Sequence, residues 1–310
     1  MLIQKNVSLK DKNWFKTGGE ARFYAEPTNL DEVVTAVTFA QSERLVTFIL
    51  GEGANILISD EGFDGLVLRP KNDKIKIDRE QGLITAGAGV AVPVLIEMAL
   101  EHNLLGLEEF SGIPGTVGGS VFINIHYCEF LLSHFLVSAT VVNLKTGKVK
   151  EVGNDWFGFG YNQSTLQNEQ WYLFDATFQL KKATDVEVAY ARGRRHEIIR
   201  HRNRRYPLER TCGSFFRNFL PEELPFTIAG KKVPFVAYYL EKVGVKGELA
   251  IGGAMVYHLH ANMLVTKEGA TSADVIAVAR TMQERVRDQF GIIPEAECQL
   301  IGFSQYPLLR

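Results

Sequence analysis

A few polar residues in this chain have the types and spacing that chemistry requires. Ser214 lies between a glycine and two aromatic residues, so its hydroxyl could be partly removed from water, although a structural serine is the alternative. Glu295 and Glu297 alternate near the C-terminus, where they could also be ordinary exposed carboxylates. His258 and His260 would share one face of a strand, but no third ligand lies nearby, so we predict no metal site. Substrate contact or ordinary packing explains this histidine pair better than a metal centre does.

The neighbours of Ser214 exclude one enzyme class and supply two further polar groups. A GxSxG elbow would need glycine at positions that hold Cys212 and Phe216, so the sequence does not favour a Ser-His-Asp hydrolase. Arg217 and Asn218 follow three and four residues after the serine. A cation and an amide therefore stand close to this hydroxyl in the sequence.

Two glycine-rich turns could hold a phosphate group. The first, residues 51–55, follows a predicted strand and would be a simple tight turn if it stood alone. The second, residues 111–119, combines flexible backbone, a proline and the expected start of a helix, which could face a diphosphate. Ile56 stands where a dinucleotide fingerprint needs its third glycine, so we expect a dinucleotide cofactor on another fold. The candidate cofactor-binding residues are Gly51, Glu52, Gly53, Ala54, Asn55, Ser111, Gly112, Pro114, Gly115, Thr116, Gly118 and Gly119.

Hydrophobic periodicity and capping residues predict the elements that must position these groups. The predicted strands cover residues 21–25, 46–50, 56–58, 65–68, 83–86, 136–144, 171–180 and 261–265. The predicted helices cover residues 28–43, 93–102, 188–205, 235–243 and 271–290, with caps at Thr28–Asn29 and at Thr271 or Ser272. Proline at position 207 disfavours helix in Tyr206, which makes this point a plausible domain boundary.

Composition and charge narrow the function classes further. The 310 residues exceed one ordinary core, so we expect two or three domains. Lys and Arg number 34 against 36 Asp and Glu, so no global field favours nucleic acid or an anionic membrane. The basic run in 188–205 could bind nucleic acid, but a solvated helix face fits better because Glu197 interrupts it. Three widely spaced cysteines and no apolar span or signal-like leader predict free thiols in a cytoplasmic protein.

Taken in order, these segments resemble the UDP-N-acetylenolpyruvoylglucosamine reductase family, the flavoenzymes that make UDP-N-acetylmuramic acid for peptidoglycan. The resemblance covers residues 13–302 and is most specific at residues 111–119, which read Ser-Gly-Ile-Pro-Gly-Thr-Val-Gly-Gly. The other matching segments are residues 13–21, 50–58, 213–218, 252–262 and 290–297. One such segment would be weak evidence, but the ordered set is strong.

The resemblance implies an α+β architecture with the vanillyl-alcohol-oxidase-like (PCMH-type) FAD-binding fold. Two FAD-binding subdomains would precede an α+β substrate-binding domain. Residues 1–75, joined by 291–310, would form the first subdomain, residues 76–205 the second, and residues 206–290 the substrate-binding domain. The return of the C-terminus would bring Glu297 to the flavin.

The resemblance also implies the reaction, in which NADPH reduces non-covalent FAD and the flavin then delivers hydride to an enolpyruvyl nucleotide sugar. Ser214 would protonate the adjacent carbon as general acid, and Glu297 would assist at the developing charge. Asn162 occupies the position of the family's catalytic arginine. Substrate contacts would come from Tyr161, Arg217, Asn218 and His260. The partner would be this small molecule alone, with neither nucleic acid nor a membrane, and the protein would be a monomer.

Two departures from the family pattern leave an alternative open. Asn162 carries no charge where an arginine is usual, and residues 125–128, Ile-His-Tyr-Cys, replace small residues expected beside the flavin. His126 in this altered segment is the favoured replacement cation. The alternative function is a diverged flavin-binding paralogue that has another substrate or no catalysis.

Overall fold

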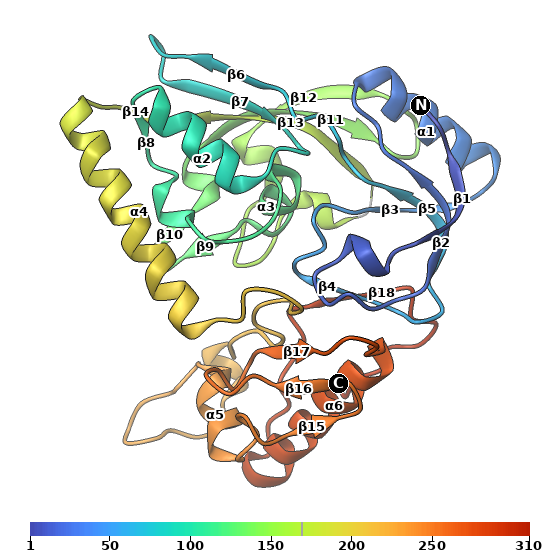
Figure 1. Ribbon diagram of the computed structural model, residues 1–310, viewed down its shortest axis with the longest axis vertical. Coiled ribbons are helices and arrows are strands. Elements are labelled where there is room, and N and C mark those ends of the chain that lie inside the picture. The colour runs from blue at the N-terminus through green and yellow to red at the C-terminus, as the bar shows by residue number, and fades with distance from the viewer. Residues whose placement is uncertain (169) are drawn as a thin grey trace. The chain divides into compact units, whose positions relative to one another are not determined.

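The computed structural model describes residues 1–168 and 170–310, and the chain forms two compact units (Figure 1). Unit 1 contains Met1–Val7, Arg22–Glu52 and Asp64–Arg202. Unit 2 contains Ser8–Ala21, Gly53–Phe63 and Asn203–Arg310. The glycine-rich turn at residues 51–55 therefore begins in one unit and ends in the other. The three-part division implied by the family resemblance stays a prediction.

A four-stranded sheet in unit 1 is covered by the first helix. Its strand order is β1 (Gln4–Ser8), β2 (Glu20–Ala25), β5 (Phe63–Leu68) and β3 (Val46–Ile49), and β3 and β5 are parallel. Helix α1 (Leu30–Ser42) buries Val33, Ala36, Val37 and Ala40, which recur at helical spacing. Its predicted start is confirmed, because the Asn29 side chain accepts a hydrogen bond from the Glu32 amide at 3.0 Å.

The larger sheet of unit 1 is antiparallel and supports the second glycine-rich turn. Its order is β12 (Val149–Gly153), β11 (Leu136–Asn143), β13 (Trp171–Gln179), β7 (Leu83–Gly87) and β6 (Ile75–Asp78). Helices α2 (Val92–Glu101) and α3 (Val117–Ile123) belong to the core that this sheet completes. Two short pairs accompany it, β9 (His126–Tyr127) with β10 (Phe130–Leu131) and β8 (Leu104–Leu105) with β14 (Lys181–Lys182).

Several arginines of the basic helix α4 (Asp185–Arg205) contact carboxylates of unit 1. Arg192 and Arg195 form ion pairs with Glu97 of α2, and Arg194 donates two hydrogen bonds of 3.0 Å to Glu109. These contacts support the interpretation as an ordinary helix face, since part of the basic run is neutralised by carboxylates of the same unit.

Unit 2 is built around one parallel strand pair, one small sheet and two helices. Strand β18 (Gln299–Ile301) pairs in parallel with β4 (Ile56–Ile58), so a C-terminal segment joins an early one. The sheet contains β15 (Ala250–Ile251), β16 (Ala254–Val256) and β17 (Leu264–Thr266). Helices α5 (Val236–Lys242) and α6 (Ser272–Phe290) complete the core, and α6 buries Val275, Ala279, Met282 and Val286 as its apolar stripe predicts.

The predicted strand at residues 261–265 is displaced in the structure. Strand β17 begins only at Leu264, because the backbone of Asn262 hydrogen-bonds the segment around Ser214 instead of continuing the small sheet.

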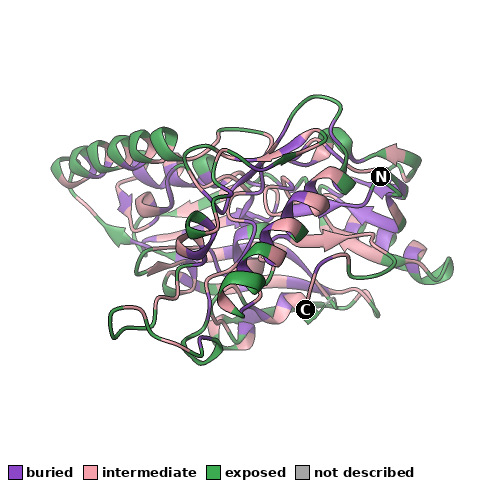
Figure 2. Cartoon of the chain, turned by 90° about the horizontal axis from the view of Figure 1, so that it is seen from below, coloured by how far each residue is buried: buried purple, intermediate pink, exposed green. Residues whose placement is uncertain are grey.

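The helices of both units are exposed on one face and covered on the other (Figure 2). All three cysteines are free, with Cys128 exposed and Cys212 and Cys298 buried. Within residues 1–168 and 170–310, no helix has the length and apolar character needed to cross a membrane.

Candidate functional site

Residues of the two glycine-rich turns meet in unit 1. The Glu52 carboxylate accepts a hydrogen bond of 3.1 Å from the amide of Gly115. A Cβ atom added at Gly51 would lie 2.9 Å from the Thr116 hydroxyl, so only glycine fits this contact. Gly115 has a φ of +132° and open space where a Cβ atom would stand. Residues 51–52 and 115–116 therefore lie against one another.

The first residues of α3 form hydrogen bonds within unit 1. Thr116 caps the helix by accepting a hydrogen bond of 3.3 Å from Gly119. The amides of Val117 and Gly118 donate to the carbonyls of Val90 and Ala88 at 2.8 and 3.0 Å. These two amides already have protein acceptors, and the expectation that the helix terminus faces a diphosphate stays a prediction.

A buried hydroxyl in this turn has no protein partner. Ser111 is 1% exposed, and its Oγ finds no hydrogen-bond partner among the described residues. An unsatisfied buried polar group is costly, so a bound group that supplies the partner would remove that cost. This hydroxyl and the open space at Gly115 fit a large cofactor with polar atoms.

A second polar cluster of unit 1 lies beyond the C-terminal end of α3. Ser164 donates to the carbonyl of Phe122 at 2.7 Å, and Asn124 donates to the carbonyl of Gly160 at 3.1 Å. These bonds hold residues 160–164 in place, including Asn162, which has a left-handed φ of 53°. The Nδ2 atom of Asn162 is buried and has no hydrogen-bond partner within the described part of the chain. Asn162 therefore holds a neutral NH2 group whose two donors are unused by the described residues.

His126 packs against Tyr161 beside this cluster, with ring centroids 4.9 Å apart. Burial lowers the pKa of His126 below its ordinary value and so favours the neutral ring. A neutral imidazole carries no charge, which argues against His126 as the replacement for a missing arginine.

The Ser214 segment is the middle one of three extended segments in unit 2. On one side, the amide of Phe215 donates to the carbonyl of Asn262 at 2.8 Å. On the other side, Arg217 donates its amide to the Glu295 carbonyl at 3.0 Å, and Glu297 donates its amide to the Phe215 carbonyl at 2.8 Å. Ser214 and Glu297 therefore belong to adjoining hydrogen-bonded segments.

The Glu297 segment is bulged where it meets Phe215. The amides of Glu297 and Cys298 both donate to the Phe215 carbonyl, at 2.8 and 3.2 Å, so two residues oppose one. Bulges redirect side chains and occur often beside active sites. Asn55 also contacts this segment, since its side chain donates to the Glu297 carbonyl at 3.5 Å and its own carbonyl accepts from Gln299 at 3.1 Å. The Asn55 side chain thus holds the segment that carries Glu297.

Asn262 is a structural residue of this arrangement to which the sequence assigned no role. It is 3% exposed, and its side chain accepts from the amide of Phe216 at 3.0 Å and donates to the carbonyl of Phe216 at 2.7 Å. The amide group thereby takes the place of a neighbouring strand. A polar amide next to an apolar strand sequence was the signal that could have identified it.

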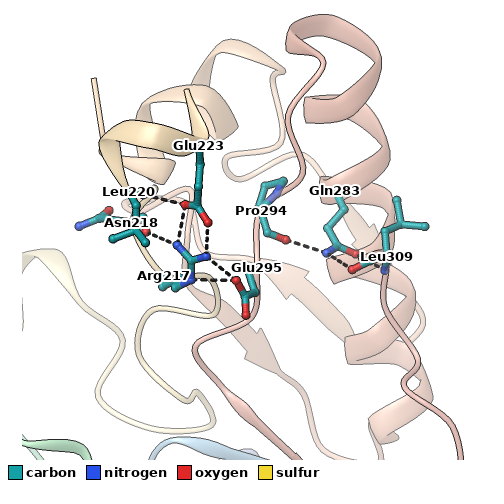
Figure 3. Close-up of polar contacts among 8 residues, drawn as sticks. All are labelled: Arg217, Asn218, Leu220, Glu223, Gln283, Pro294, Glu295 and Leu309. Carbon is teal, nitrogen blue, oxygen red and sulfur yellow. Dashed lines mark hydrogen bonds and ion pairs between the residues drawn. The ribbon is translucent and has the colours of Figure 1, made fainter. Parts of the chain in front are cut away.

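The remaining predicted residues of unit 2 have protein partners. Arg217 contacts the carboxylates of Glu223 and Glu295 (Figure 3). The Asn218 side chain accepts a hydrogen bond of 3.2 Å from Val236 at the start of α5. His260 accepts a hydrogen bond of 3.2 Å from the Asn262 amide, and burial, followed by the charge of a neighbouring arginine, lowers its pKa. None of these contacts assigns a substrate role.

Comparisons with known proteins agree with the geometry. An FAD-binding domain model matches residues 21–153, and the C-terminal domain of UDP-N-acetylenolpyruvoylglucosamine reductase matches residues 205–301. The chain is 34% identical over 303 residues to the UDP-N-acetylenolpyruvoylglucosamine reductase of Prochlorococcus marinus, covering 97% of this chain and 98% of that one. It is 32% identical over 304 residues to that of Trichormus variabilis, covering 98% and 87% of the two chains.

A solved structure has the same fold over nearly the whole chain. The crystal structure of a UDP-N-acetylenolpyruvylglucosamine reductase from Thermus caldophilus superimposes with a TM-score of 0.77 at 25% identity, covering 97% of this chain and 100% of that one. Together with the two family models, this likeness confirms the predicted α+β architecture with an FAD-binding fold.

Proposed function

The chain belongs to the UDP-N-acetylenolpyruvoylglucosamine reductase family, and we propose that it reduces UDP-N-acetylenolpyruvoylglucosamine to UDP-N-acetylmuramate for peptidoglycan synthesis. The observation that carries this proposal is the similarity to reductases along the whole chain, 97% of it in one relative. NADPH is the reductant and FAD the bound cofactor. We also propose that the protein works in the cytoplasm as a monomer.

In this proposal, FAD is held without a covalent bond by the two glycine-rich turns. Ser111 supplies a hydroxyl that has no protein partner, Gly115 leaves room for close approach of the cofactor, and Gly51 allows the two turns to meet. The remaining turn residues proposed to bind it are Glu52, Gly53, Ala54, Asn55, Gly112, Pro114, Thr116, Gly118 and Gly119. When bound, FAD supplies hydride transfer from NADPH to the enolpyruvyl double bond.

Ser214 is proposed as the proton donor for the carbon next to the one that receives hydride. A hydroxyl is a weak acid, so it must be held in one geometry and removed from bulk water. Ser214 is half-buried, and the hydrogen bonds that Asn262 makes with Phe215 and Phe216 restrain its segment from one side. Glu297 on the opposite segment is proposed to assist as negative charge develops.

Asn162 is proposed to give the substrate a neutral hydrogen-bond donor in place of an arginine charge. Its buried, unpartnered Nδ2 atom supports this role. A neutral donor stabilises a developing oxyanion less than a guanidinium does, because hydrogen bonds to charged groups are stronger. We propose Tyr161, Asn218 and His260 as further substrate contacts.

Anaerobic half-reactions test this function directly. NADPH should bleach the flavin absorbance, and addition of UDP-N-acetylenolpyruvoylglucosamine should then restore it with formation of UDP-N-acetylmuramate. Bleaching without restoration would contradict the proposed substrate. A protein that is never bleached by NADPH would contradict the proposed reductase activity altogether.

A further inference from the structure

We infer that Arg217 is a positioning residue that fixes the Ser214 segment against the Glu297 segment, rather than a ligand for the substrate's phosphates. This inference rests on the proposed roles of Ser214 and Glu297. An arginine side chain offers five N–H groups, and each one used in a protein contact is lost to a phosphate.

The five N–H groups of Arg217 match five contacts within unit 2. The Nε atom donates to Glu295 at 3.0 Å, and Nη1 donates to Glu223 at 2.8 Å and to the carbonyl of Asn218 at 3.0 Å. The Nη2 atom contacts both Glu223 and Glu295. Figure 3 shows the guanidinium between these two carboxylates. No donor is left over for a phosphate unless one of these contacts breaks.

The charge of this cluster also opposes phosphate binding. One guanidinium faces two carboxylates, so the three side chains together carry a net negative charge. The hydrogen bond from Arg217 is the main cause that lowers the pKa of Glu223, which keeps this carboxylate ionised at neutral pH. An anionic diphosphate would therefore be repelled by the group that Arg217 belongs to.

The same contacts connect the two segments that matter for the reaction. Arg217 lies three residues after Ser214, and Glu295 lies two residues before Glu297. Their backbones are already joined, since the Arg217 amide donates to the Glu295 carbonyl at 3.0 Å. The side-chain fork adds a second connection at this point, because Nε and Nη2 both donate to one oxygen of Glu295. On its other edge the guanidinium forms a two-oxygen pair with Glu223, and such a planar pair fixes its orientation more firmly than a single bond does.

Gln283 of α6 restrains the other side of the Glu295 segment. This side chain is fully buried, donates to the Pro294 carbonyl at 2.7 Å and accepts from the Leu309 amide at 2.9 Å (Figure 3). Residues 294–297 are thus held by a buried amide on one side and by the Arg217 fork on the other. Loosening the fork should leave this segment anchored at Pro294 but free to shift at Glu297.

The first experiment measures positioning without any need for activity. Arg217→Lys keeps the positive charge and removes the planar fork. Arg287→Lys on α6 is the matched control, because Arg287 pairs with the exposed Asp288. We expect Arg217→Lys to speed hydrogen–deuterium exchange at the amides of Arg217, Glu297 and Cys298 by roughly ten-fold or more, while Arg287→Lys leaves them unchanged. Unchanged exchange in Arg217→Lys would overturn the inference.

The second experiment separates positioning from phosphate binding. In Arg217→Lys, we expect flavin reoxidation by the enolpyruvyl nucleotide to slow by roughly 10-fold to 100-fold, because small misplacements cost this much. The Kd of the nucleotide for the oxidised enzyme and the rate of reduction by NADPH should stay within about two-fold. A Kd raised about ten-fold with an unchanged reoxidation rate would identify a phosphate ligand instead.

Glu295→Gln distinguishes the two roles by the sign of its effect, and it covers the case in which Arg217→Lys fails to fold. Positioning predicts slower reoxidation in this variant, whereas a phosphate ligand freed from one carboxylate would bind the nucleotide more tightly. Failure of the proposed function has a separate signature, because wild-type enzyme would then not be reoxidised by the nucleotide, while the exchange result would still decide the role of Arg217.

Discussion

At the scale of single residues, Ser214 carries the clearest prediction. We expect Ser214→Ala to slow flavin reoxidation by about 10²–10⁴, the usual contribution of a positioned general acid, and to leave reduction by NADPH unchanged. Stopped-flow absorbance resolves the two steps, and Ser304→Ala at an exposed position is the control. Equal slowing of both steps would mean that this serine only supports the structure.

Two half-buried histidines predict how stability depends on pH. His126 and His260 both have lowered pKa values, with burial as the first cause, so the unfolded chain binds their protons more readily than the folded chain does. The free energy of unfolding must then rise with pH in the range where these histidines titrate. This stability is lost as the pH falls through 6.5, the ordinary pKa of histidine, and below. Urea titrations between about pH 7 and pH 5 should show a falling free energy of unfolding.

Matched variants test the assignment of this pH dependence. His126→Gln and His260→Gln remove the titrating rings and should each flatten the dependence, whereas His258→Gln at an exposed position should leave it unchanged. The lowered pKa of His126 also means that His126→Gln should lower turnover by much less than loss of a catalytic charge would. A heavy loss of turnover would restore His126 as the replacement cation.

At the scale of elements, the predicted start of α6 can be tested for its energetic contribution. Thr271 accepts a hydrogen bond of 3.1 Å from the Asp274 amide, and Asp274 accepts one of 3.0 Å from the Thr271 amide. Thr271→Ala should reduce the free energy of unfolding by about 1 kcal/mol. Thr281→Ala, within the same helix, should cost less, because its hydroxyl only bonds a helix carbonyl. Equal losses in urea titrations would show that the cap has no special role.

The sequence predicted elements best where local signals decide the structure. The predicted caps at Thr28–Asn29 and at Thr271 or Ser272 marked the starts of α1 and α6, where the structure selects Asn29 and Thr271, because these contacts join residues three positions apart. The three-segment arrangement around Ser214 was not predicted. It depends on single bridges, Ser214 with Met263 and Phe216 with Ala296, between irregular segments that have no strand periodicity of their own. The turns at residues 51–55 and 111–119 were found from glycine content, but their contact through Glu52 required the fold.

At the scale of the whole molecule, cofactor retention should depend on the close packing around α3. A Cβ atom added at Gly118 would lie 3.1 Å from the Cβ of Ala88, so Gly118→Val should displace the turn before the helix. We expect this variant to be purified with much less FAD than the wild type, measured as the ratio of flavin to protein absorbance. Gly193→Ala in α4 has open space and is the control.

The binding mode gives this prediction a second readout. Because we propose non-covalent FAD, acid precipitation of the wild type should release the flavin into the supernatant. Flavin that remains with the precipitated chain would contradict this mode, and full flavin content in Gly118→Val would contradict the assigned turn.

The parallel pairing of β4 with β18 has a consequence for synthesis on the ribosome. Ile56 and Gln299 are register partners, yet roughly 240 residues separate them. At about 5–20 residues per second, the nascent chain would carry β4 without its partner for roughly 12 to 50 seconds. All three residues of β4 are buried in the finished protein, so this apolar strand is exposed to misassociation during that interval. We therefore expect newly made chains to depend on chaperones until translation has passed β18.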